Sequence, residues 1–168
     1  PQTSSRLIQR SATIQREQFD DIPIVNYRIL LVDDSALARK LMHRVLVTLG
    51  KSASKSCQVH YVFDIQHAAT GQAAYDMVVR SLKDGAAYDL VLIDFYMPQL
   101  NGAQAVCLMR VAGFSNAIVA VTSCTCDDEL YTLSKSGVNY ILEKPFTLKK
   151  FSNLFREYVI DRSSLNHC

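Results

Sequence analysis

The segment YRILLVDD, residues 27–34, joins a short apolar run to two consecutive aspartates. A short, continuous apolar run rich in Leu and Ile is typical of a β-strand that is buried on both faces. Beginning at Ser35, which stands in the N-cap position, the apolar side chains change to the spacing of a helix. The segment therefore predicts a buried strand that ends in two acids and leads directly into a helix.

The same alternation of strand and helix signals repeats along the rest of the chain. The further strand-like segments are residues 61–68, 90–93 (LVLI), 117–121 (AIVAV) and 138–142. Between and after them, apolar side chains recur at helical spacing, as in Ala38, Leu41, Met42, Val45 and Leu49, in Ala74, Met77, Val78 and Leu82, and in Phe151, Leu154, Phe155, Tyr158 and Val159. Continuous apolar strands favour a parallel sheet with helices on both faces and right-handed crossovers. The sequence thus predicts an α/β domain of five strands and five helices.

Boundaries follow from the same patterns. Residues 1–25 are rich in Gln, Ser, Arg and Asp and are interpreted as a linker or N-terminal extension, residues 26–160 as one domain, and residues 161–168 as a C-terminal tail. Gly50 is expected to end the first helix, and residues 51–60, with two lysines, are expected to form an exposed loop. Because the chain begins with Pro1, we expect a fragment or a processed product.

Composition narrows the class of protein. The chain has 168 residues, 49% hydrophobic and 20% charged, which is ordinary for one globular domain. A net charge of +2 makes a direct nucleic-acid or membrane-surface role unfavourable. There is no apolar run of about 18 residues that could span a membrane, and five cysteines without a framework of spacings indicate reduced thiols in the cytoplasm.

Polar side chains follow the predicted strands where each strand ends. Asp33 and Asp34 follow the first strand, and Asp94, Thr122 and Lys144 come at the ends of the third, fourth and fifth. Because the carboxyl ends of parallel strands meet at one edge of the sheet, these groups are expected to lie together. Clustered carboxylates repel unless a cation lies among them, and Mg²⁺ is held by carboxylate and water oxygens. A carboxylate at such a site can attack phosphorus, and a hydroxyl and a lysine can stabilise the phosphoryl oxygens.

Four segments, ILLVDDS, LVLIDFYMP, AVTS and EKPF, together resemble the receiver domain of two-component response regulators, over roughly residues 27–160. The resemblance implies a flavodoxin-like, doubly wound, five-stranded parallel sheet in the order 2-1-3-4-5 with five surrounding helices. It implies that Asp94 is the phosphoacceptor and that Asp33, Asp34 and Asp94 hold Mg²⁺, with the backbone carbonyl of Tyr96 completing the metal shell.

The resemblance also assigns two further residues. Thr122 matches the switch hydroxyl and Lys144 the phosphate-binding lysine, whose bond to Pro145 is cis in the family. The chain departs from the family pattern at three places. Ile141 stands where the family usually has a switch aromatic, the loop at residues 50–60 is longer, and Tyr96 is bulky for its position. We expect Ile141 to reduce the change on the strand at residues 138–142, and Tyr96 to shield the phosphorylated aspartate from water.

Several functions fit these residues. The preferred interpretation is a phosphoacceptor domain, not itself an enzyme, that takes a phosphoryl group from a histidine kinase or a histidine phosphotransfer domain. Its downstream partner is expected at the face of the helix after residue 125, strand 138–142 and the last helix. Such a receiver belongs either to a hybrid sensor histidine kinase, which we favour, or to a stand-alone regulator. The alternatives are a haloacid-dehalogenase-like phosphohydrolase, which needs an acid where Tyr96 stands, and a degenerate receiver that only binds.

Overall fold

The computed structural model describes residues 23–57, 59–123 and 126–161. The predicted extension up to residue 22 and the predicted tail from residue 162 lie outside the described residues. Five parallel strands form one sheet: β1 (Ile24–Val32), β2 (His60–Ala68), β3 (Leu90–Asp94), β4 (Ala117–Thr122) and β5 (Tyr140–Glu143). Their order is β2-β1-β3-β4-β5, which confirms the flavodoxin-like fold.

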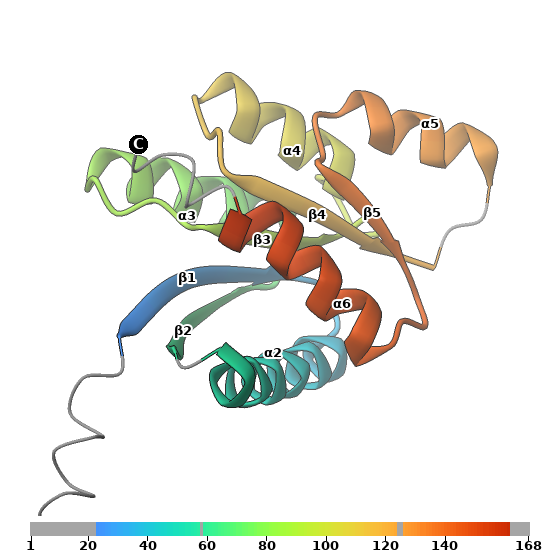
Figure 1. Cartoon of the computed structure of the whole chain (residues 1–168). Coiled ribbons are helices and arrows are strands. Elements are labelled where there is room, and N and C mark those ends of the chain that lie inside the picture. The colour runs from blue at the N-terminus through green and yellow to red at the C-terminus, as the bar shows by residue number, and fades with distance from the viewer. Residues whose placement is uncertain (1–22, 58, 124–125, 162–168) are drawn as a thin grey trace, which may run out of the picture.

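Helices cover both faces of this sheet, as Figure 1 shows. They are α2 (Ala36–Cys57), α3 (Gly71–Lys83), α4 (Gly102–Val111), α5 (Asp127–Lys135) and α6 (Leu148–Phe155), which continues into a π-helix, η1 (Arg156–Ile160). On β1, Ile29 and Leu31 face the core under α2 and α6, whereas Leu30 and Val32 face the core under α3 and α4. Because all four side chains are buried, the strand is apolar throughout its second half, as its sequence indicated.

The prediction of a loop at residues 51–60 is wrong, because α2 passes through Gly50 and ends at Cys57. Glycine in a helix interior costs about 1 kcal/mol relative to alanine, which is why it was taken as a stop. Here Gly50 is buried, and a Cβ atom at this position would meet the ring of Phe63 on β2 at 3.4 Å. The helix packs on β2 at this point without interruption, and the segment 51–57 continues it.

On the opposite face of the sheet, Arg110 in the last turn of α4 connects the loop after α4 to the loop after α5. The guanidinium of Arg110 donates to the carbonyl oxygens of Phe114 and Asn116 at 2.6 and 2.8 Å and to that of Gly137 at 2.9 Å. A fourth bond, of 2.8 Å, goes to the side chain of Asn139. One side chain thus binds three backbone carbonyls, and it connects α4 to the segment after α5.

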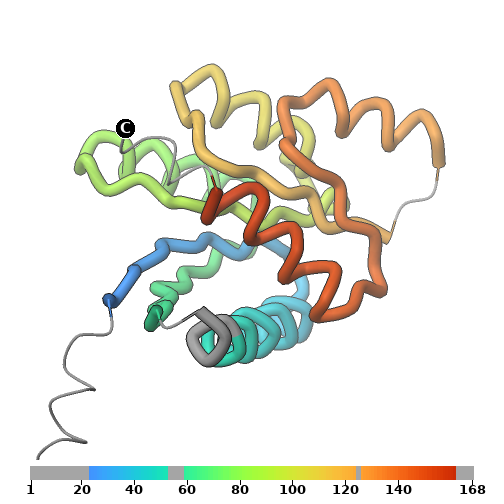
Figure 2. The backbone as a smooth tube through the Cα atoms, in the orientation of Figure 1, coloured from blue at the N-terminus to red at the C-terminus, as the bar shows by residue number. Residues whose placement is uncertain are grey.

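The path of the chain places a functional site at the carboxyl edge of the central strands. From β1 the chain goes to the edge strand β2 and then returns to the other side of β1 for β3, β4 and β5, as can be followed in Figure 2. The order of the strands reverses between β1 and β3, and ligands of such sheets bind beyond the carboxyl ends at that point. Among the described residues, none of the helices has the length and apolar character needed to cross a membrane.

Candidate functional site

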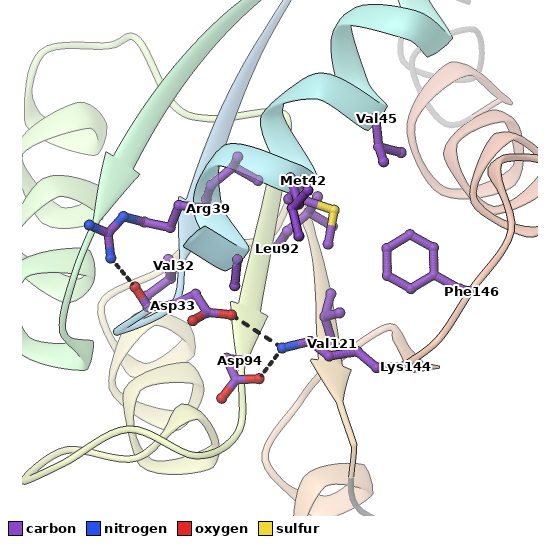
Figure 3. Close-up of a pocket in the computed structure, with 13 residues that line it drawn as sticks. Val32, Asp33, Arg39, Met42, Val45, Leu92, Asp94, Val121, Lys144 and Phe146 are labelled. Carbon is purple, nitrogen blue, oxygen red and sulfur yellow. Dashed lines mark hydrogen bonds and ion pairs between the residues drawn. The ribbon is translucent and has the colours of Figure 1, made fainter. Parts of the chain in front are cut away.

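An ion pair network connects three of the predicted residues at this edge. The ammonium nitrogen of Lys144, which follows β5, lies 2.7 Å from Oδ1 of Asp94 and 3.2 Å from Oδ2 of Asp33. Asp94 is the last residue of β3, and its side chain is only 9% exposed. Figure 3 shows both carboxylates directed at the lysine from neighbouring strands. Residues that are 50 and 111 positions apart in sequence therefore meet at one point.

Burial and close charges shift the pKa values of two members of this network, Asp94 and Lys144. Beside it opens a cavity of about 230 Å³, whose lining includes Leu92 and Val121 from the sheet, Met42 from α2 and Phe146. Burial raises the pKa of the Asp94 carboxyl, and Asp33 adds to the rise, whereas the hydrogen bond and charge of Lys144 oppose it. For Lys144, burial alone would lower the pKa, but the hydrogen bonds and charges of the two carboxylates outweigh burial and raise it. Lys144 therefore stays charged as the counter-ion of the two acids.

The two aspartates after β1 have different surroundings. Oδ1 of Asp33 accepts the backbone N–H of Ser35 at 2.8 Å, and Arg39 donates to the backbone carbonyls of Asp33 and Asp34. Asp33 is partly buried, but Asp34 is exposed. These hydrogen bonds fix the backbone at this point, while the Asp34 side chain is exposed to solvent.

The segment after Asp94 is held in one conformation by close backbone contacts. The backbone N–H of Tyr96 donates to Oδ2 of Asp94 at 2.9 Å. At the start of α4, Gly102 donates its N–H to the carbonyl of Phe95, and a Cβ atom at Gly102 would lie 2.2 Å from the carbonyl oxygen of Asp94. Only glycine fits at this position, so helix α4 closes directly onto the residue that follows the acid.

Thr122 ends β4, the strand next to β3, and Ile141 lies on β5, the strand beyond β4. Asp94 pairs in register with Val121 of β4, so Thr122, which is fully buried, lies just beyond Asp94 at the same edge. Ile141 is half-buried and packs on the small core cluster that contains Leu133 of α5. The Lys144–Pro145 peptide bond is cis, as the resemblance implied.

The donor set fits a magnesium ion. Two carboxylates converge on one cation, the ammonium of Lys144, at distances of 2.7 and 3.2 Å. Within the described part of the chain, no group of three His, Cys, Asp or Glu side chains is arranged to hold a metal ion, so Asp34 is not grouped with the other two acids. Mg²⁺ in proteins commonly takes one or two carboxylates and completes its shell with water and phosphate oxygens. Asp33 and Asp94 can supply that pair.

Sequence reasoning missed two contacts around this site. The hydroxyl of Tyr96 donates to the carboxylate of Glu129 in the first turn of α5. On the other side, Nδ1 of His43 on α2 and Nε2 of His67 on β2 are 3.1 Å apart. Each pair joins elements that are distant in sequence, and no local spacing signals such a meeting.

A doubly wound parallel sheet with acids and a lysine at its switch point defines the class of flavodoxin-like α/β domains. The family model of the response regulator receiver domain matches residues 29–156. The chain belongs to this family, whose members are signalling domains of two-component systems.

Two relatives from yeast are much longer than the chain. It is 32% identical over 139 residues to the transcription factor SKN7 of Saccharomyces cerevisiae, which covers 83% of the chain and 20% of that protein. Identity to the osmosensing histidine protein kinase SLN1 of the same yeast is 26% over 149 residues, or 88% of the chain and 11% of the kinase. The chain thus spans about a fifth and about a tenth of these two relatives.

Solved structures share the fold. One is the receiver domain of a sensor histidine kinase from Pseudomonas aeruginosa, described with a magnesium ion in its active-site cleft. Its TM-score is 0.65 at 23% identity, and the match covers 80% of this chain and 98% of that one.

Proposed function

We propose that this domain accepts a phosphoryl group from a phosphohistidine onto Asp94. The observation that carries the proposal is the convergence of Lys144 on Asp94 and Asp33, at 2.7 and 3.2 Å, at the switch point of the sheet. The donor would be a histidine kinase or a histidine phosphotransfer domain, and the domain would act as a signalling switch rather than as an enzyme. Membership of the receiver family supports this assignment.

Each residue has a distinct task in the proposed reaction. The Asp94 carboxylate attacks phosphorus, the P–N bond to the donor imidazole breaks, the new P–O bond gives an aspartyl phosphate, and the imidazole takes a proton from solvent. Burial raises the pKa of Asp94, which makes its carboxylate more nucleophilic than one in water. The backbone N–H of Tyr96 orients this carboxylate through Oδ2. The Lys144 ammonium, which binds the Asp94 carboxylate before the reaction, would bind the phosphoryl oxygens after it.

Asp33 and Asp94 would hold Mg²⁺, with Asp34 and the backbone carbonyl of Tyr96 as the further ligands that the family resemblance suggests. When bound, the ion supplies positive charge for the transferring phosphoryl oxygens. Thr122, at the end of β4, would then bind a phosphoryl oxygen, and the face of α5, β5 and α6 would change for a downstream protein partner.

For the setting, we favour a receiver within a hybrid histidine kinase of the cytoplasm. The likeness to the osmosensing kinase supports it. The likeness to a transcription factor favours a second setting, a receiver joined to an output domain. A stand-alone regulator is the third setting, and likeness to two-component response regulators of Arabidopsis thaliana supports it. The sequence on both sides of these residues in the complete gene would decide among the three.

The experiment that tests the proposed reaction is phosphorylation by a small phosphodonor in the presence of Mg²⁺, read by intact mass. We expect one phosphoryl group on the wild type and on the control Asp84→Asn, an exposed acid after α3. Asp94→Asn should take none, and EDTA should prevent the reaction. Full labelling of Asp94→Asn would show that the phosphoacceptor is another residue. Release of phosphate in many turnovers would instead support the phosphohydrolase.

A further inference from the structure

Tyr96 connects the site to helix α5. Its backbone N–H is bound to Asp94, and its hydroxyl donates to Glu129, 33 residues further along the chain. The ring between these two ends is half exposed and packs edge-on against Phe95, with ring centroids 4.9 Å apart. A shift of the Tyr96 peptide must therefore either move Glu129 or break the hydrogen bond to it.

Glu129 lies among other negative charges at the start of α5. Its first turn holds three acids, Asp127, Asp128 and Glu129, which interact favourably with the helix N-terminus. A phosphoryl group adds about 1.5 to 2 negative charges, and these repel carboxylates nearby. Phosphorylation of Asp94 changes the group that the Tyr96 N–H contacts, and so acts on one end of the connection whose other end is Glu129.

On β5, the position at which the receiver family usually has a switch aromatic is occupied by Ile141. Ile141 is β-branched, half-buried, and already packed on the cluster that includes Leu133 of α5. It has no large solvent-facing position from which to turn inward. Among the described residues, Tyr96 contacts both the site and α5, through its backbone N–H and its hydroxyl.

We propose that the hydrogen bond between Tyr96 and Glu129 is a latch that holds α5 in its unphosphorylated position and opens when Asp94 is phosphorylated. Glu129 is thus a positioning residue, and Tyr96 connects it to the reacting carboxylate. This inference rests on the proposed phosphorylation of Asp94.

The test compares latch variants in the free state and with beryllofluoride and Mg²⁺, which imitate the phosphorylated state. Tyr96→Phe removes only the hydroxyl, Glu129→Ala removes the acceptor, and Glu129→Gln keeps an oxygen that can accept. The matched control is Asp128→Asn, an exposed acid beside Glu129. The readouts are the backbone amide chemical shifts of residues 127–135 and the apparent affinity for beryllofluoride.

We expect the free Tyr96→Phe and Glu129→Ala proteins to have α5 amide shifts close to those of the beryllofluoride-bound wild type. Because the latch no longer opposes the change, they should bind beryllofluoride roughly three- to tenfold more tightly. The α5 amide shifts and the beryllofluoride affinity of Glu129→Gln should lie between those of these variants and the wild type. Both quantities in Asp128→Asn should match the wild type.

Wild-type affinity and full-sized beryllofluoride shifts of α5 in both Tyr96→Phe and Glu129→Ala would overturn the latch while leaving the phosphoacceptor intact. Absence of any beryllofluoride response around Asp94 in the wild type would instead overturn the proposed function and the latch together. A double-mutant cycle between positions 96 and 129 adds a second measure, since a latch requires non-additive effects on affinity.

Discussion

Replacement of Lys144 by alanine measures how much the domain depends on its internal counter-ion. The lysine makes two charged hydrogen bonds, at 2.7 and 3.2 Å, and its side chain is 29% exposed. A hydrogen bond to a charged group contributes roughly 1.5–3 kcal/mol, and partial exposure reduces the sum by screening. We expect Lys144→Ala to lower the free energy of unfolding by about 2–3 kcal/mol in metal-free buffer, or roughly 5–10 °C in Tm.

Magnesium should reverse most of this loss. Without Lys144, the carboxylates of Asp33 and Asp94 face each other uncompensated, and a bound divalent ion replaces the missing charge. At a concentration near 100 times its Kd, a ligand stabilises the folded state by about 2.7 kcal/mol. The variant should therefore gain more stability from Mg²⁺ than the wild type does.

The assay is urea unfolding followed by circular dichroism at pH 8, with EDTA and then with saturating Mg²⁺. The control is Lys149→Ala, an exposed lysine of α6 for which the described residues provide no ion pair. Equal stability of the two variants in EDTA would refute the role of Lys144 as counter-ion. A loss in Lys144→Ala that Mg²⁺ does not reduce would refute the convergence of the acids on one cation position.

Three further outcomes are expected. Asp34→Ala should lower Mg²⁺ affinity by roughly tenfold or more. The loss should exceed that in Asp33→Ala, because the family resemblance matches Asp34 to a direct metal ligand, whereas Asp33 is paired with Lys144; calorimetric titration measures both. Tyr96→Ala should speed the loss of the aspartyl phosphate severalfold, and an unchanged half-life would mean that the ring only packs. Burial, the neighbouring His43 and a nearby guanidinium lower the pKa of His67 below 6.5, so the folded state binds fewer protons than the unfolded state. Stability should therefore fall as the pH drops below about 6.5, and it should fall less in His67→Gln, as urea midpoints at several pH values can show.

The meeting of Asp33, Asp94 and Lys144 could be predicted because one rule, that parallel strands end at the same edge, brings their positions together. The same rule placed Thr122. The loop predicted at 51–60 is wrong because a glycine signals a helix end only by local propensity, whereas the packing of α2 on Phe63 depends on a strand that comes later in the chain.

The contact between Tyr96 and Glu129 shows the limit of such reasoning. The hydroxyl lies at the far end of a long side chain, and whether it reaches α5 depends on the position of the whole helix over the sheet. Neither residue type nor spacing encodes that position. The same holds for His43 and His67, whose separate surroundings on α2 and β2 give no sign of the 3.1 Å contact between their rings.

The Arg110 tie determines how α5 can respond when its first turn is released. The carbonyl of Gly137, just after the helix, accepts a hydrogen bond from the guanidinium at 2.9 Å, so movement of the C-terminal end of α5 away from α4 would break this bond. If the first turn of α5 is released while this bond persists, we expect the helix to rotate about its C-terminal end, with a displacement that grows with distance from Gly137. Asp127 should travel furthest and Lys135 least, which gives a partner protein an angular signal to recognise.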